Sequence, residues 1–152
     1  MNFQEALDKI KSKHEVLESK EDLGVLNAFI SPAKIAAVAA FLKDELGFKQ
    51  LNFITAVDLP ANNSLEVVYR FLSYDTADAV VIRVKLERAK ASVETISGVF
   101  KTANWHERET AEMFGITFLK HPDPNRLILP DGIEAPLLKD YKNPDMTPLP
   151  KA

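Results

Sequence analysis

The segment NWHERETAEMFG, residues 104–115, concentrates side chains that could do chemistry. Its ionisable members are His106, Glu107, Arg108, Glu109 and Glu112. His106 and Glu107 begin the pattern H-E-x-x-H, in which two histidines four residues apart on a helix bind zinc. Thr110 occupies the place of the second histidine, and the chain has only three histidines, so the sequence argues against a metal site.

The carboxylates of this segment leave two further interpretations open. Glu107, Glu109 and Glu112 would suit general acid–base catalysis if two of them faced one pocket. The chain has no Gly-rich phosphate loop, no G-x-S-x-G motif and no cysteine nucleophile to mark such a pocket. The alternative is a solvated helix face with no chemistry of its own.

Helical geometry singles out Glu107. At ~100° per residue, one side of the helix carries Trp105, Arg108, Glu109 and Glu112. The apolar side comprises Thr110, Met113 and Phe114, with His106 and Glu107 at its two edges. A carboxylate beside an apolar face is costly unless it is paired. We therefore expect that the cluster satisfies itself internally or that another chain completes it.

The composition narrows the class of protein. The chain has 152 residues, enough for one domain with a core, and its hydrophobic and charged contents of 46% and 27% are those of a soluble globular protein. A net charge of −3 without a basic run argues against nucleic acid and anionic lipid as partners. The longest apolar stretch, residues 35–42, is shorter than the ~20 residues that cross a bilayer. The absence of cysteine excludes thiolate-held clusters within the chain.

Hydrophobic periodicity predicts the elements that position the cluster. In chain order they are a helix over 3–17, a strand over 24–30, a helix over 31–47, strands over 48–60, 64–75 and 78–88, and helical periodicity over 92–115 with a break near Gly98 or Asn104. The second helix has Ser31 as N-cap, Pro32 at its first position and Gly47 as its stop. The fold class is therefore α+β, a two-layer sandwich with helices on one face of a mainly antiparallel or mixed sheet.

The C-terminal segment has a different composition. Seven of the nine prolines lie from residue 122 onward, and proline is incompatible with a central strand or a long helix. A disordered tail is one interpretation, but the apolar runs LILP (127–130) and APLL (135–138) would gain nothing in a solvated tail. We expect an α+β core domain, residues 1–121, and an extended arm, residues 122–152, that packs on a partner.

Residues 103–131, ANWHERETAEMFGITFLKHPDPNRLILPD, closely resemble the family of the 30-kDa subunit of respiratory complex I, which in bacteria is the C subunit of NADH–quinone oxidoreductase. The matching positions are Glu107, Arg108, Glu109, Glu112, Met113, Phe114, Gly115, Ile116, Phe118, His121, Pro122, Asp123, Arg126, Leu127 and Ile128. ITAVD (54–58) and PLLKDY (136–141) also look like features of this family, so the resemblance covers about the last two-thirds of the chain.

This resemblance implies a non-catalytic structural subunit without a cofactor of its own. It implies docking on the 49-kDa-type, hydrogenase-large-like subunit and on the small iron–sulfur subunit, in the hydrophilic arm at the cytoplasmic side of the cell membrane. Membrane contact would then come only through partner subunits. The residues expected at the subunit interface are Glu107, Arg108, Glu109, Glu112, Phe114, His121, Pro122, Asp123, Arg126, Leu138, Lys139, Asp140 and Tyr141.

Departures from the family pattern keep alternatives open. Pro124 stands where leucine is usual, Ala111 where an aromatic is frequent, and Leu138 where arginine is usual. Similar subunits serve energy-converting [NiFe] hydrogenases and F420H2 dehydrogenases, so the electron donor, the acceptor and the pumped ion stay undetermined. A free-standing carboxylate enzyme and an assembly or adaptor protein are the other two hypotheses.

Overall fold

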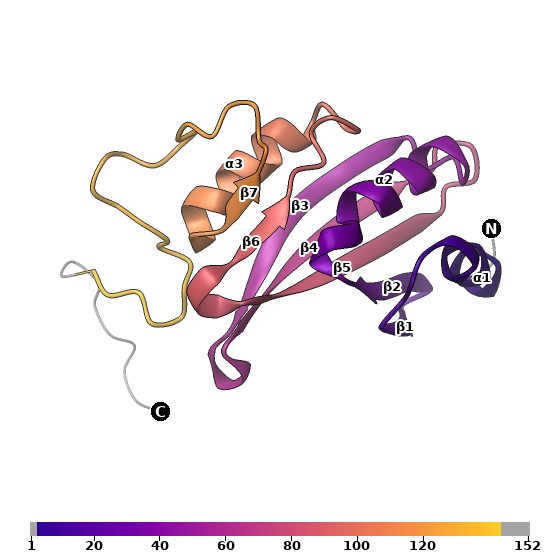
Figure 1. Ribbon diagram of the computed structural model, residues 1–152, viewed down its shortest axis with the longest axis horizontal. Coiled ribbons are helices and arrows are strands. Elements are labelled where there is room, and N and C mark those ends of the chain that lie inside the picture. Colours follow the sequence, from indigo (N-terminus) through magenta and orange to yellow (C-terminus); the bar gives the residue numbers. More distant parts are fainter. Residues whose placement is uncertain (1–2, 144–152) are drawn as a thin grey trace.

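A five-stranded mixed sheet forms the centre of the molecule, as the computed structural model shows for the residues that it describes, 3–143 (Figure 1). The strand order is β1-β2-β5-β4-β3. The strands are β1 (Glu18–Asp22), β2 (Val25–Ile30), β3 (Gln50–Leu59), β4 (Ser64–Leu72) and β5 (Ala79–Glu87). The predicted strands are thus confirmed with slightly shorter bounds.

The pairing explains why one sheet face is so apolar. Strands β3, β4 and β5 are successive antiparallel neighbours, and β2 joins β5 in parallel. One register row runs across four strands through Ala28, Ile82, Tyr69 and Ile54. All four of these side chains are buried, and period-two alternation in each strand places their apolar neighbours on the same face.

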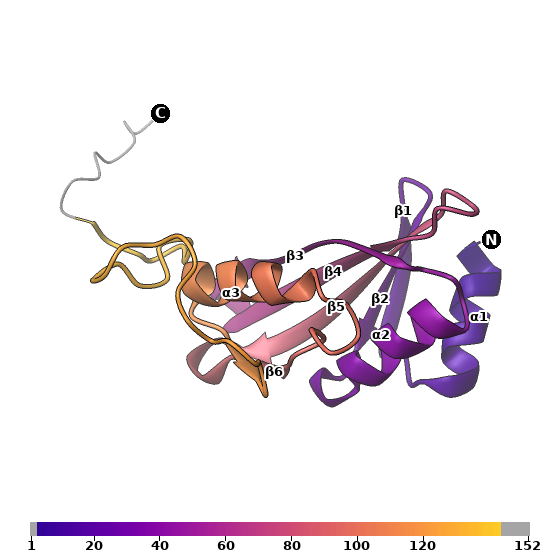
Figure 2. The same ribbon diagram turned by 90° about the horizontal axis from the view of Figure 1, so that it is seen from above.

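The helices supply the second layer. They are α1 (Phe3–Lys13), α2 (Ile35–Asp44) and α3 (Ala103–Phe114), with a short 3₁₀ turn, Pro32–Lys34, leading into α2. In Figure 2, α2 and α3 lie on the same side of the sheet, and the apolar residues of all three helices belong to one core with the strands. The expected α+β fold with helices over a mixed sheet is confirmed. Gly47, at φ +76°, ends the α2 segment as predicted.

The N-terminal region differs from the expectation in one respect. The first helix ends at Lys13 instead of 17, and β1 follows it as an edge strand. The β1 sequence, ESKED, is almost entirely exposed, so it has none of the apolar alternation by which a strand is recognised. Its strand character depends on antiparallel pairing with β2.

The expectation of helical periodicity from residue 92 is wrong for 92–102. Ser92–Glu94 form the short strand β6, turns follow, and the helix begins only at Ala103. Strand β6 pairs in parallel with β7 (Thr117–Leu119), which comes after α3. The physical reason is this pairing: Val93 and Phe118 are neighbours in the ladder and both side chains are buried.

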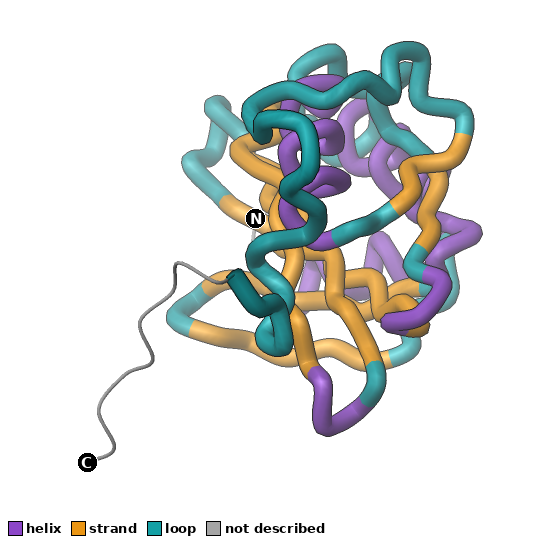
Figure 3. Tube along the Cα trace, turned by 90° about the vertical axis from the view of Figure 1, so that its left-hand side faces the viewer, coloured by secondary structure: helices purple, strands orange, loops and turns teal. Residues whose placement is uncertain are grey.

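The chain after β7 has no helix or strand up to residue 143. Figure 3 shows this stretch as a long loop that runs beside α3. Residues 144–152, the rest of the arm predicted from the sequence, lie outside the described residues.

Candidate functional site

Helix α3 presents the charged cluster and ends at a glycine cap. Its C-cap is Gly115 at φ +71°, whose N–H donates to the Ala111 carbonyl oxygen. The Thr110 hydroxyl donates to the His106 carbonyl oxygen within the helix at 2.7 Å and lies 3.3 Å from the carbonyl oxygen of Ile54, so this buried residue packs the helix against β3. The buried face is Ala103, Glu107, Thr110 and Phe114. Glu107 therefore lies within the buried face and not at its edge, which corrects the helical-wheel expectation.

Glu107 is fully buried and its carboxyl is satisfied within the chain. The Ile96 N–H donates to Oε1 at 2.7 Å, and Thr95 Oγ1 lies 2.5 Å from Oε2. Burial raises the pKa of Glu107 to about 7, and the bonds from Thr95 and Ile96 oppose part of that rise. Glu107 is therefore satisfied within the chain by hydrogen bonds and not by a cation, and the donors come from the segment after β6.

His121 adjoins this carboxyl at the point where the arm begins. Its Nε2 lies 3.5 Å from Glu107 Oε2 and 3.2 Å from the Asn104 carbonyl oxygen. The N–H of Asp123 donates to His121 Nδ1 at 3.1 Å. Because Nδ1 accepts this bond, the ring hydrogen lies on Nε2, which faces Glu107 Oε2 and the Asn104 carbonyl oxygen. His121 thereby fixes the turn into the arm.

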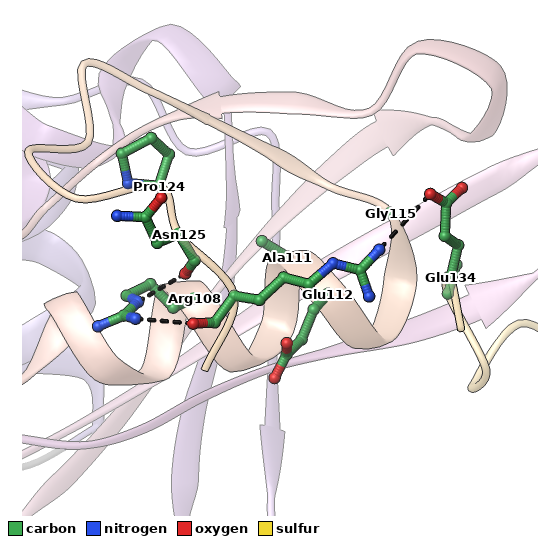
Figure 4. Close-up of a pocket in the computed structure, with 9 residues that line it drawn as sticks. Arg108, Ala111, Glu112, Gly115, Pro124, Asn125 and Glu134 are labelled. Carbon is green, nitrogen blue, oxygen red and sulfur yellow. Dashed lines mark hydrogen bonds and ion pairs between the residues drawn. The ribbon is translucent and has the colours of Figure 1, made fainter. Parts of the chain in front are cut away.

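Arg108 and Glu112 hold the next part of the arm against α3 (Figure 4). Arg108 donates from Nε to the Asn125 carbonyl oxygen and from Nη2 to the Arg126 carbonyl oxygen, at 2.8 and 2.9 Å. Its Nη1 lies 3.2 Å from Asp123 Oδ2. The helix therefore supplies a side-chain donor for arm carbonyls that no strand or helix satisfies.

Glu112 supplies the hydrogen-bond acceptors for the arm, as Arg108 supplies the donors. Its carboxylate accepts the backbone N–H groups of Leu127, Ile128 and Leu129 at 2.8–3.2 Å. Burial alone would raise the pKa of Glu112, but these three donors hold the pKa below its ordinary value. Arg126 then closes the following loop, donating from Nη1 to the carbonyl oxygens of Pro130 and Ile133. The predicted charged residues thus form hydrogen bonds mainly with the backbone of the arm.

A second set of contacts fastens the arm at Lys139 and Asp140, and sequence reasoning missed its central residue. Arg88, just after β5, donates to both carboxylate oxygens of Asp58 at 2.7 and 2.9 Å and also to Asp140. Lys139 donates its N–H to Asp58 Oδ2 at 2.8 Å. Arg88 has no sequence signal of its own. The two segments it joins, ITAVD and PLLKDY, were both recognised from the sequence.

The remaining predicted interface residues divide by burial. Phe114 is buried, Leu138 packs against the core, and Tyr141 is half-buried. Glu109 and Pro122 are exposed. Glu109 borders a hollow of about 360 Å³ between α3 and β3, apart from Glu107 and Glu112. The three glutamates therefore do not converge on one pocket as a paired-carboxylate site requires.

Several large apolar side chains around α3 and the arm face solvent. Trp105, Ile128 and Leu137 are 62%, 60% and 54% exposed. The Arg108 guanidinium lies 5.7 Å from the centre of the Trp105 ring. Over residues 3–143, no group of three His, Asp or Glu side chains is placed to hold a metal ion. The site thus combines polar side chains that are hydrogen-bonded within the chain and large apolar side chains that are exposed to solvent.

The sequence matches a known family over most of its length. Residues 28–147 match the family model of the respiratory-chain NADH dehydrogenase 30-kDa subunit. The C subunit of the F(420)H(2) dehydrogenase of Methanosarcina mazei is 38% identical over 119 residues, which cover 77% of this chain and 75% of that one. The C subunit of the NADH-quinone oxidoreductase of Geotalea uraniireducens is 36% identical over 149 residues, 94% of this chain and 91% of its own.

Two solved structures share the fold. One belongs to the membrane-bound sulfane sulfur reductase, an archaeal respiratory membrane complex; it superposes with a TM-score of 0.81 at 24% identity and covers 91% of this chain and 85% of its own. The other is a trypsin-resistant fragment of Nqo5, with a TM-score of 0.68 at 25% identity, covering 81% of this chain and 99% of the fragment.

Proposed function

Because the chain belongs to the family of the respiratory-chain NADH dehydrogenase 30-kDa subunit, we propose that it is a non-catalytic structural subunit of a membrane-associated, complex-I-like oxidoreductase. It belongs to a multisubunit respiratory complex. In this role it supports electron transfer coupled to ion translocation by holding neighbouring subunits in place.

The observation that carries the proposal is that the polar side chains around α3 are paired within the chain, whereas large apolar side chains there are exposed. Arg108, Glu112 and Arg126 use their hydrogen bonds on the arm backbone, while Trp105, Ile128 and Leu137 stay exposed. Polar groups that are already paired within the chain enter an interface at a lower desolvation cost than unpaired ones, and exposed apolar groups gain by burial there. The predicted interface residues therefore act mainly by shaping the arm that docks.

The proposed partners are the 49-kDa-type, hydrogenase-large-like subunit and the small iron–sulfur subunit of the same complex. In this arrangement, the large subunit covers Ile128 and Leu137. Leu138, Lys139, Asp140 and Tyr141 form the segment of the arm that Arg88 holds in place. The proposed location is the cytoplasmic side of the cell membrane. Within residues 3–143, no helix is both long and apolar enough to cross a bilayer.

A second candidate is the equivalent subunit of an F420H2 dehydrogenase. The specific observation in its favour is the 38% identity to the F(420)H(2) dehydrogenase subunit of Methanosarcina mazei. The corresponding subunit of an energy-converting [NiFe] hydrogenase is the third candidate. All three share the docking role and differ in the chains that would be found alongside.

The test is affinity purification of the tagged chain from detergent-solubilised membranes, with identification of the co-purifying chains. Hydrogenase-large-like and iron–sulfur subunits in stoichiometric amounts are expected. An NADH-binding or F420-binding partner would distinguish the first two candidates. Recovery of the chain alone under conditions that keep membrane complexes intact would contradict a subunit role.

A matched pair of variants tests the docking surface. Ile128→Asp places a charge on the proposed contact, and Leu23→Asp places one on an exposed leucine in the turn between β1 and β2. Both side chains face solvent in the isolated chain, so both variants should melt as the parent does. Ile128→Asp should lose its partner chains and Leu23→Asp should keep them. If Leu23→Asp lost the partner chains and Ile128→Asp kept them, the interface would lie at the β1–β2 end of the molecule and the proposed docking surface would be wrong.

A further inference from the structure

A chain of hydroxyl groups connects the buried carboxyl of Glu107 with the molecular surface. Thr95 Oγ1 lies 2.5 Å from Glu107 Oε2 and 2.8 Å from Ser97 Oγ, and the Ser97 N–H donates to Thr95 Oγ1 at 3.1 Å. Glu107 has no exposed surface, whereas Thr95 and Ser97 are both partly exposed. The two hydroxyl oxygens therefore lie in line between the carboxyl and the partly exposed Ser97.

This hydroxyl chain has two self-consistent hydrogen arrangements. A hydroxyl has one hydrogen, so Thr95 can donate to Glu107 or to Ser97 but not to both. With Glu107 ionised, Ser97 donates to Thr95 and Thr95 donates to the carboxylate. With Glu107 protonated, the carboxyl donates to Thr95 and Thr95 donates to Ser97. The carboxyl oxygen and both hydroxyls keep a partner in either state.

The surroundings favour the protonated state. From β4, Tyr69 is buried against the core; from the arm root, His121 accepts the Asp123 N–H at Nδ1. The cations on the packed elements are engaged with other acceptors: Lys43 of α2 with the Val99 carbonyl oxygen, Arg108 of α3 with Asp123 and the arm carbonyls, and Lys120 beyond β7 with Glu94 of β6. A buried carboxylate without a cation takes up a proton.

We propose that Glu107 is a buried proton-binding site that exchanges its proton with solvent through the hydroxyls of Thr95 and Ser97. One proton enters at Ser97 Oγ, each hydroxyl passes on its own hydrogen, and one proton arrives at Glu107 Oε2. No bond other than O–H forms or breaks, and release runs the same path in reverse. This site is independent of the docking role.

The elevated pKa of Glu107, about 7 against an ordinary 4.5, agrees with this assignment and places the exchange near neutral pH. The site also lies beside the root of the arm, since Glu107 Oε2 is 3.5 Å from His121 Nε2.

The first test is a carbon-13 NMR titration of the glutamate carboxyl signals in the full chain, with the Glu107 signal identified by its absence in Glu107→Gln. The expected midpoint is near 7, and the exposed Glu134 provides an internal comparison. A Glu107 midpoint at its ordinary 4.5 would overturn the site. Proton uptake on His121 in place of Glu107 over the same range would also overturn it.

The second test separates the relay from the site. After a pH jump, the infrared band of the protonated carboxyl reports how fast Glu107 ionises. Ser97→Ala removes the outer hydroxyl and leaves the Thr95 contact, so the midpoint should stay and the rate should fall. Thr95→Val removes the inner hydroxyl and should lower the rate and raise the midpoint. Equal rates of Glu107 ionisation in the parent and in Ser97→Ala would overturn the relay. This comparison tests the relay even if Thr95→Val does not fold.

Discussion

Of the ion pairs that hold the arm in place, the one between Arg88 and Asp58 is expected to be the most costly to break. Asp58 has a side chain with no exposed surface, and Arg88 contacts both of its oxygens, at 2.7 and 2.9 Å. Arg88→Ala would remove both guanidinium donors from the Asp58 carboxylate and leave it the uncharged Lys139 N–H. A buried charge stranded in this way costs about 3–5 kcal/mol of unfolding free energy.

The contribution of the other Arg88 partner is small by comparison. The Asp140 side chain is 65% exposed, and an exposed pair contributes about 1 kcal/mol or less. For a chain of this size a loss of 3–5 kcal/mol corresponds to roughly 6–20 °C in Tm. Thermal and urea unfolding of the purified chain at pH 7 therefore should show a large loss for Arg88→Ala and a small one for Asp140→Ala.

The pH dependence of that difference gives an independent check. The Arg88 hydrogen bonds, against the effect of burial, lower the pKa of Asp58 below its ordinary 3.8. A carboxyl with a lowered folded-state pKa contributes stability that is present above 3.8 and lost as the pH falls through the folded value. The gap between parent and Arg88→Ala should therefore narrow below pH 4.

Asp58→Asn in the Arg88→Ala background removes the stranded charge and should restore part of the stability. If Arg88→Ala lost no more than Asp140→Ala, the buried pair would not be the anchor of the arm. A gap that stayed constant down to acid pH would likewise refute the role of the Asp58 charge.

Three further perturbations probe the carboxyls and the arm. Glu107→Gln mimics the protonated carboxyl. The raised pKa of Glu107 in the folded state contributes stability that is present below pH 4.5 and is lost as the pH rises through about 7. At pH 8 the free energy of unfolding of the variant in urea should therefore exceed that of the parent by up to about 3 kcal/mol. Glu112→Ala leaves three arm N–H groups without their acceptor, so hydrogen exchange at residues 127–129 should accelerate while the sheet exchanges as before. Arg108→Ala releases the arm carbonyls and should speed tryptic cleavage after Arg126, with Arg108→Lys intermediate because it keeps the charge and loses the fork.

Local signals in the sequence were sufficient for most of the layer architecture. The alternation in β3, β4 and β5 and the Pro32 and Gly47 boundaries of the α2 segment depend on neighbours within a few residues. The need of Glu107 for a partner also followed from helical geometry and the cost of burying a charge. Each of these properties belongs to one element considered by itself.

The partner of each charged group was decided only by the tertiary structure. Thr95 and Ile96 reach Glu107 because the β6–β7 pairing brings the segment before α3 under the helix, and that pairing joins strands of three residues each. Arg88 reaches Asp58, 30 residues away, and Asp140, 52 residues away. Contacts over such separations depend on the path of the whole backbone, and the residue types along a local window carry no record of that path.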